Sequence, residues 1–337
     1  MITYPILKKG ATIGVTAPSS GVEPELHDMF KQACIRSEER GYPVVCGETV
    51  WTQDKAKSAY AQVRAKEFNK MMQDENIDII IPPWGGEILI EIMDKLDFDS
   101  FQKKWVLGYS DISVLLLATT LKTGMATAHG TNFVDLRGEY SDETTAMWEK
   151  VLSTIEGESI TQYSSDKFQK TWDHENLSPV VFHLTEQTEW KTLSGDYATL
   201  KGRLLGGCID IIRHLIGTPY GNIHRFQKES INSEPILWYF ENCQLNTTDL
   251  RRTLIQMKLA DWFDNCSGVI FGRSSANKTV ENYDVEEVYK NLEQELNIPI
   301  IYDIDCGHVP PQVTLINGAY AEVEVRSGKG KLVQSFN

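Results

Sequence analysis

Ser110, Glu241 and His308 are residue types that together can activate a serine nucleophile. Each follows an apolar run that predicts a buried strand, and open α/β sheets bind ligands at the carboxyl ends of their strands. A serine hydroxyl becomes nucleophilic when an imidazole takes its proton, and a carboxylate fixes the tautomer of that imidazole. The three types therefore fit acyl-transfer chemistry on the condition that the fold brings them together.

Each of these residues also has an ordinary structural interpretation. Ser110 or Asp111 would cap the helix that is predicted to follow them. Glu241 would be a solvated residue at a strand end, and His308 would be a loop histidine bound by backbone groups. His129 also follows a predicted strand and competes with His308 for the role of base.

Gly85 and Gly86 follow the apolar run of residues 77–81. Backbone without side chains can approach a developing oxyanion closely, although a tight turn from strand to helix explains the pair equally well. The chain has neither the Gly-x-Gly-x-x-Gly pattern of dinucleotide sites nor a His-Glu-x-x-His segment or cluster of cysteine and histidine. We therefore expect no cofactor and no metal.

The composition is that of a globular protein with an acidic surface. The chain has 337 residues, enough for two domains, and 47 acidic against 33 basic side chains give a formal net charge of -14. This charge argues against nucleic acid or an anionic membrane as the main partner. The six cysteines form no Cys-x-x-Cys pair, which favours buried thiols. No leader-like segment and no long apolar run is present, so we expect a cytoplasmic protein.

Strand and helix signals alternate through the first part of the chain, which is typical of a parallel sheet covered by helices. The predicted strands are residues 12–18, 43–46, 77–81, 105–108 and 125–129. We expect an N-terminal doubly wound parallel-sheet domain over residues 1–165, carrying the nucleophile.

The polar stretch from residue 140 to 192 interrupts this alternation. After it we expect a smaller C-terminal α/β domain with mixed strands over residues 193–337, carrying the glutamate and histidine. Near its end, period-two alternation on both sides of Asn317-Gly318 predicts a hairpin.

Residues 166–192 are predicted to be a linker or lid over a cleft between the domains. Trp172 and Trp190 lie there among polar residues. A tryptophan outside a periodic apolar face packs on a neighbour or offers a flat surface to a ligand. We expect both to bind substrate, with filling of the domain junction as the alternative.

Several separated segments resemble the serine LD-carboxypeptidases (peptidase family S66), and more closely the MccF-like branch of microcin C immunity proteins. They run in family order and cover nearly the whole chain. The segments are residues 9–20, 78–86, 108–111 (Gly-Tyr-Ser-Asp), 202–207 (Gly-Arg-Leu-Leu-Gly-Gly), Glu241 and 307–310 (Gly-His-Val-Pro).

The resemblance implies that Ser110 is the nucleophile, His308 the general base and Glu241 its orienting carboxylate. It also implies an oxyanion hole formed by the amides of Asp111 and the Gly85-Gly86 turn. Family members are cytoplasmic, need no metal, are commonly homodimers and hydrolyse amide bonds, so we expect the same here.

Two departures from the family pattern concern the choice of substrate. Cys208 stands where the family usually has an asparagine after Gly-Gly, so we expect it in the substrate pocket. Asn242 stands where a further acidic residue is usual beside the glutamate.

The resemblance leaves three functions open. The first is cleavage of a peptidyl- or aminoacyl-nucleotide antibiotic of the microcin C type, which the chain length and the tryptophan-bearing segment favour. The second is a muropeptide LD-carboxypeptidase in cell-wall recycling. The third is a non-catalytic immunity protein that sequesters its ligand.

Overall fold

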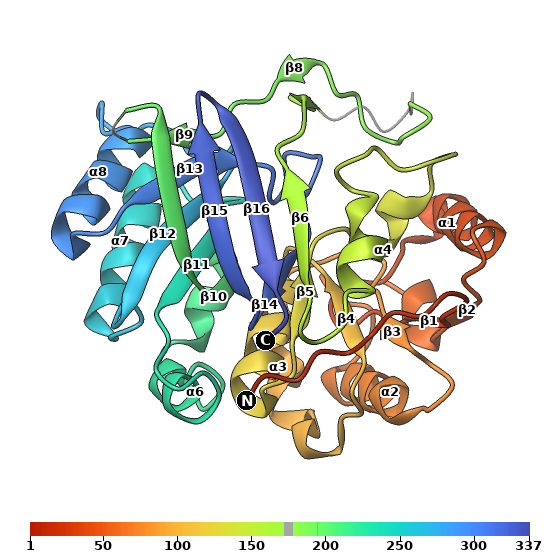
Figure 1. Cartoon of the computed structure of the whole chain (residues 1–337). Helices are drawn as coiled ribbons and strands as arrows, with labels where there is room; N and C mark the ends of the chain where they lie inside the picture. Colours follow the sequence, from red (N-terminus) through yellow and green to blue (C-terminus); the bar gives the residue numbers. More distant parts are fainter. Residues whose placement is uncertain (172–177, 194) are drawn as a thin grey trace.

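The structure of the chain is a computed structural model that describes residues 1–171, 178–193 and 195–337. Two β-sheets lie side by side, with helices packed around and between them (Figure 1). The ends of the chain lie close together, where Tyr4 stacks on Phe336 with ring centroids 4.8 Å apart. No helix in the described part of the chain combines the length and apolar character needed to span a membrane.

The first sheet has six strands in the order β14-β5-β4-β3-β1-β2. The five strands from the N-terminal half pair in parallel, and β14 joins the edge in antiparallel orientation. The strands are β1 (Ile13–Val15), β2 (Val44–Cys46), β3 (Ile79–Ile80), β4 (Trp105–Gly108), β5 (Thr127–His129) and β14 (Leu315–Asn317). The predicted parallel-sheet architecture is confirmed.

The second sheet has eight strands in the order β6-β16-β15-β10-β11-β12-β13-β9. Its four central strands are parallel and the remaining pairs are antiparallel, so the predicted mixed sheet is also confirmed. The strands are β6 (Ser159–Tyr163), β9 (Lys191–Thr192), β10 (Tyr197–Cys208), β11 (Ile236–Glu241), β12 (Cys266–Gly272), β13 (Ile300–Ile304), β15 (Tyr320–Arg326) and β16 (Lys329–Ser335). A separate ribbon pairs β7 (Lys167–Phe168) with β8 (Glu186–Gln187).

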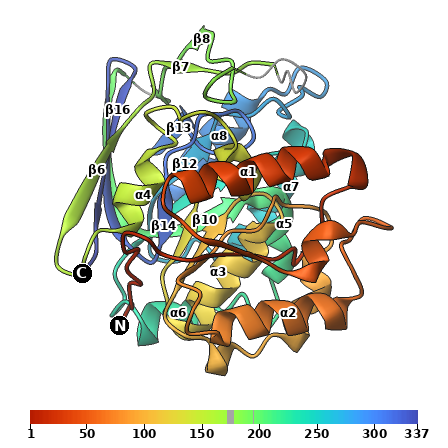
Figure 2. The same ribbon diagram turned by 90° about the vertical axis from the view of Figure 1, so that its right-hand side faces the viewer.

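Helix α3 is the central helix of the fold, and Figure 2 shows it between α2 and the strands. Every residue from Ile112 to Leu121 is buried, because α3 packs against β5 of the first sheet and β10 of the second. The α-helices are α1 (His27–Glu39), α2 (Ala61–Gln73), α3 (Ile112–Thr123), α4 (Met147–Leu152), α5 (Ile209–Ile212), α6 (Ile223–Glu229), α7 (Thr247–Leu259) and α8 (Val285–Leu296). Short 3-10 helices include η3 (Leu89–Lys95) and η5 (Phe133–Leu136).

Each sheet contains a strand from the opposite half of the chain. Strand β14, from the C-terminal half, pairs with β5 of the first sheet, and β6, from the N-terminal half, pairs with β16 of the second. The two sheets therefore do not coincide with two continuous stretches of sequence. The division at residues 165 and 193 remains a prediction.

The predicted hairpin at Asn317-Gly318 is wrong. The chain passes there from β14 in one sheet to β15 in the other, and the hairpin forms around Ser327-Gly328 between β15 and β16. The Asn317 side chain instead satisfies buried donors, because its Oδ1 accepts from the Gly206 amide at 2.9 Å and the Tyr239 hydroxyl at 3.0 Å.

Candidate active site

Ser110 occupies the turn between β4 and α3 with a left-handed backbone, φ 64°. This conformation is strained for a residue with a side chain and is typical of serines presented at a strand-to-helix turn. The amide of Tyr109 donates to Oδ1 of Asn132 at 3.2 Å, which anchors the turn to the segment after β5. The side chain of Ser110 therefore emerges at the carboxyl end of the parallel strands.

The three predicted residues come together in one hydrogen-bonded chain. Nε2 of His308 lies 3.0 Å from Oγ of Ser110, and Nδ1 of the same ring lies 2.8 Å from Oε2 of Glu241. Glu241 is the last residue of β11 and only 1% exposed, whereas Ser110 and His308 are partly exposed. This is the order of groups that a serine nucleophile, its base and an orienting carboxylate require.

The electrostatics of the pair fit a carboxylate that stabilises a protonated ring. Burial raises the pKa of Glu241, but the charge and hydrogen bond of His308 outweigh it and hold this pKa below its ordinary value. Burial also opposes protonation of His308, yet the Glu241 carboxylate outweighs it and the pKa of His308 lies well above its usual value. A buried charge is tolerated here because its partner is within hydrogen-bonding distance.

His308 reaches Glu241 because the residue before it has no side chain. Gly307 has φ 96°, and a Cβ added there would lie 2.6 Å from Oε2 of Glu241. The loop is also fixed at Asp305, which is fully buried and forms an ion pair with Arg273 at 2.9 Å.

His129 does not reach Ser110. It is fully buried at the end of β5, with Nδ1 3.8 Å from Sγ of Cys306 and rings of Tyr109 and Tyr239 nearby. Burial, the main cause, lowers the pKa of His129 to about 4. Of the two histidines that the sequence leaves as candidates for the base, His308 is therefore the one placed next to Ser110.

The Gly85-Gly86 turn lies directly against the serine. A Cβ at Gly85 would stand 2.7 Å from Oγ of Ser110 and 3.0 Å from the Asp111 amide nitrogen. A Cβ at Gly86, where φ is 146°, would collide with Oγ of Ser19 and Ser20. Only glycines fit, and the turn brings its backbone beside the Asp111 amide, as an oxyanion site requires.

The Asp111 side chain ties two loops to the start of α3. Its Oδ2 accepts from Oγ of Ser19, in a short contact, and from the Leu89 amide at 2.8 Å. Burial is the main cause that raises the pKa of Asp111. The carboxyl is therefore used inside the structure, while the backbone nitrogen of Asp111 lies beside Gly85.

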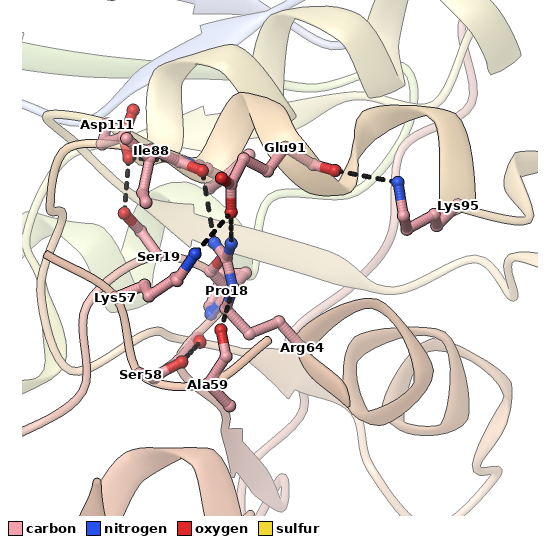
Figure 3. A network of polar contacts seen from close by, with 12 residues as sticks. Pro18, Ser19, Lys57, Ser58, Ala59, Arg64, Ile88, Glu91, Lys95 and Asp111 are labelled. Atoms are coloured by element: carbon pink, nitrogen blue, oxygen red, sulfur yellow. Dashed lines mark hydrogen bonds and ion pairs between the residues drawn. The ribbon is translucent and has the colours of Figure 1, made fainter. Parts of the chain in front are cut away.

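Arg64 contacts the same two loops, at Pro18 and at Ile88 (Figure 3). Its fully buried guanidinium donates to the carbonyls of Pro18 at 2.8 Å and Ile88 at 3.2 Å, and pairs with Glu91 at 2.5 Å. Figure 3 shows these contacts converging on one side chain next to the Asp111–Ser19 bond. Arg64 therefore positions the segments on both sides of the Gly85-Gly86 turn.

Cys208 is buried next to Glu241 and is not among the wall residues of the cleft at Ser110. It pairs with Glu241 in register on the neighbouring parallel strand, is 1% exposed, and its thiol lies 3.4 Å from Oδ2 of Asp210. The expectation that it contacts substrate does not hold, because a side chain buried to this degree offers no surface to a ligand. Asn242 is also buried, where its amide binds Leu245 and Asn277.

The expected ligand contact of Trp190 does not hold either. The ring is 1% exposed and packs on Gly330 of β16, and its Nε1 donates to Oδ2 of Asp305 at 2.9 Å. No face of the ring is free to stack on a ligand. Trp172, the other expected ligand contact, lies outside the described residues.

The open cleft in front of Ser110 has a volume of about 420 Å³. Sequence reasoning missed several of its walls, among them Ser20, Gln53, Trp84 and Asn132. Trp84 carried a usable signal, because it directly precedes Gly85. Its ring is held at the cleft by a hydrogen bond from Nε1 to the Gly21 carbonyl at 3.1 Å.

One group of side chains in the described residues has the spacing of metal ligands. Atoms of His224, Asp261 and Asp264 lie within 4.8 Å of one another, and all three residues are exposed. Exposed groups of this kind occur commonly without a metal, and none of the three belongs to the Ser110 cleft.

The chain is similar in sequence to proteins of known families. Two family models match the chain: the LD-carboxypeptidase N-terminal domain over residues 13–130 and the LD-carboxypeptidase C-terminal domain over residues 201–323. The microcin C7 self-immunity protein MccF of Escherichia coli is 23% identical, covering 94% of this chain and 92% of its own.

Solved structures share the fold. MccF in complex with glutamyl sulfamoyl guanosine aligns with TM-score 0.81 and 19% identity over 99% of both chains. The muramoyltetrapeptide carboxypeptidase from Oxalobacter formigenes aligns with TM-score 0.74 and 20% identity, covering 96% of this chain and 99% of its own.

Proposed function

The chain belongs to the LD-carboxypeptidase family of serine carboxypeptidases, and on that premise we propose that Ser110, His308 and Glu241 are its catalytic triad. The observation that carries the proposal is the unbroken chain of hydrogen bonds from Oγ of Ser110 through His308 to Glu241. The position of Ser110 beside the Gly85-Gly86 turn, which has no side chains, supports the same role.

In this mechanism Nε2 of His308 takes the proton from Ser110 as Oγ attacks the carbonyl carbon of an amide. The amides of Asp111 and the Gly85-Gly86 turn stabilise the negative charge that develops on the carbonyl oxygen. His308 then gives the proton to the leaving amine, and an acyl-enzyme ester remains on Ser110. Water, activated by His308, hydrolyses this ester and regenerates the serine.

The test is covalent trapping of the serine. A serine-reactive phosphonate should form one adduct, located on Ser110 by peptide mass spectrometry, and Ser110→Ala should form none. Ser20→Ala, which changes another serine of the same cleft, is the matched control and should still be labelled. An unlabelled wild-type protein that binds its ligand without turnover would instead indicate an immunity protein that sequesters the ligand.

For the substrate we propose the amide bond of a peptidyl- or aminoacyl-nucleotide antibiotic of the microcin C type, hydrolysed in the cytoplasm. The relation to MccF supports this class, since MccF is a microcin C7 self-immunity protein and binds glutamyl sulfamoyl guanosine. The acidic chain suits a small-molecule substrate better than a polyanion, and a homodimer is the assembly we expect from the family.

A muropeptide LD-carboxypeptidase is the second candidate, because a muramoyltetrapeptide carboxypeptidase shares the fold over nearly the whole chain. Product analysis separates the two. Incubation with an aminoacyl-nucleotide should release the amino acid and the nucleotide, while a peptide with a terminal D-amino acid should stay intact. Release of the D-amino acid alone would assign the enzyme to cell-wall recycling.

A further inference from the structure

A second cavity, of about 930 Å³, adjoins the Ser110 cleft. The two share four wall residues, Leu26, Trp84, Tyr109 and Asn132. Its volume falls in the range of about 300–1,000 Å³ that is usual for small-molecule sites. A substrate whose scissile amide lies at Ser110 can therefore extend into this space.

Most of the cavity wall is apolar. The side chains of Met29, Val134, Pro179 and Val181 line it, together with Trp84 at the boundary with the cleft. Such a wall accepts an apolar or aromatic portion of a ligand. The polar groups in the wall then decide which ligand is oriented correctly.

Arg137 is the more deeply buried of the two arginines in this wall. The residue lines the cavity but is only 5% exposed, and its Nη1 donates to the Val134 carbonyl at 2.7 Å. Its Nε, like that of Arg36 in the same wall, is buried without a hydrogen-bond partner among the described residues, but Arg36 has a close ion pair with Glu39 at 2.8 Å. A buried guanidinium with an unused donor is costly, and an incoming acceptor would remove that cost.

The loop that carries Arg137 is held from two sides. Arg40 of α1 donates to the carbonyls of Leu136 at 2.6 Å and Gly138 at 2.7 Å. The amide of Val134 donates to the Pro83 carbonyl at 3.2 Å, directly before Trp84. Arg137 is therefore presented on a rigid segment next to the cleft.

Among the described residues, the acid paired with Arg137 makes only one long contact with it. Oδ1 of Asp135 is 4.0 Å from Nη1, and the Asp135 carboxyl already binds Tyr109 and the Asn132 amide. Burial, the main cause, raises the pKa of Asp135, and the charge of Arg137 opposes this shift. Asp28 and Glu139 also line the cavity but are exposed to water.

We propose that Arg137 binds an anionic oxygen group of the substrate, a peptide carboxylate or a nucleotide phosphate, while the apolar wall holds the adjoining part. The inference rests on the proposed function, since it assumes that the substrate amide lies at Ser110. A guanidinium suits both groups because it can offer two parallel donors to two oxygens. The site therefore selects an amide substrate that also carries a fixed negative charge.

The test compares the affinity of matched anionic and neutral compounds for Ser110→Ala, so that no turnover is needed. One pair is a tetrapeptide ending in a D-amino acid and its C-terminal carboxamide. The other is an aminoacyl-nucleotide and its neutral phosphate methyl ester. In one of the pairs the anionic member should bind about 10- to 100-fold more tightly, as expected for one charge-assisted contact, and that pair identifies the source of the anion.

Adding Arg137→Gln should bring this ratio close to one. Adding Arg225→Gln should leave it unchanged, because Arg225 lines neither the cavity nor the cleft and pairs with Glu229 at 2.7 Å. Arg137→Lys, which keeps the charge, should retain part of the preference and serves if Arg137→Gln does not fold. Equal affinities within both pairs, or a preference that survives Arg137→Gln, would overturn the assignment. Neither result bears on phosphonate labelling of Ser110, which tests the triad separately.

Discussion

The indole Nε1 of Trp190 donates to Oδ2 of Asp305 at 2.9 Å within the hydrophobic core of the second sheet. The same carboxylate accepts from the Ser165 amide at 2.8 Å and pairs with Arg273 at 2.9 Å. Asp305 begins the short loop that ends at His308. Trp190 therefore helps to fix the loop that carries the candidate base. It is not a surface on which a ligand could stack.

Trp190→Phe should destabilise the protein by about 1–3 kcal/mol, because it leaves Asp305 with an unmade hydrogen bond in a buried site. Urea denaturation measures this change. Trp238→Phe, which removes a similar buried indole bond to the Trp262 carbonyl, is the matched control and should destabilise without affecting kcat. A selective rise in KM for a nucleotide substrate in Trp190→Phe would show that Trp190 does contact the ligand.

The pH dependence of kcat/KM should report the raised pKa of His308. The base must be neutral, so activity is lost as the pH falls through the pKa of His308, and the acid limb should lie above pH 6.5, the ordinary histidine value. In Glu241→Gln the imidazolium loses its stabilising carboxylate, so the limb should move to lower pH while kcat falls by about 10⁴.

His129 supplies the control for that experiment. His129→Gln should leave the position of the acid limb where it is in the wild type, because His129 does not contact Ser110. A limb that moves with His129→Gln and stays in Glu241→Gln would show that the wrong histidine has been assigned.

Gly85→Ala should lower kcat by about 10²–10³, the usual effect of losing one oxyanion donor. The added methyl group would stand 2.7 Å from Oγ of Ser110 and force the turn away from the serine. Circular dichroism and steady-state kinetics measure fold and rate together. Gly157→Ala, whose methyl group would meet no atom within 4 Å but whose φ of 90° strains an alanine, should lose some stability and keep its kcat. Full activity in Gly85→Ala would exclude this turn from the site.

Arg64→Lys should lower kcat more than it changes KM, because an ammonium cannot hold the Pro18 and Ile88 carbonyls together with Glu91. We expect a loss of about 1–3 kcal/mol in stability as well, since buried carbonyls lose a charged donor. Arg225→Lys is the comparison, an exposed pair with Glu229 that should change stability by less than about 1 kcal/mol. A purely structural Arg64 would lower stability and leave kcat of the folded fraction unchanged.

Position at a strand end makes Ser110 and Glu241 candidates, and the family resemblance assigns the roles within the site. Ser110 after β4 and Glu241 at the end of β11 follow apolar runs that are easily recognised, and parallel strands bring such ends to one edge. His308 is farther from its strand, and its motif with Gly307 was the better indication. The meeting of these residues depends on how the two sheets pack, which no local pattern encodes.

The residues that sequence reasoning placed wrongly or missed depend on long-range contacts. Trp190 has polar neighbours in sequence, yet a partner at Asp305 makes it a core residue. Asn317 resembles a turn residue but satisfies buried donors on two other strands. Arg137 gave no signal, because only the folded cavity reveals that its Nε lacks a partner.

The exchange of strands between the sheets has a consequence for synthesis on the ribosome. Strand β5 leaves the exit tunnel early, but its outer edge is covered only when β14 arrives from the opposite end of the chain. At about 5–20 residues per second, the nascent protein carries an open strand edge for roughly 10–40 s. Unpaired edges recruit other chains, so the first half of this protein is the stretch most in need of a chaperone before translation ends.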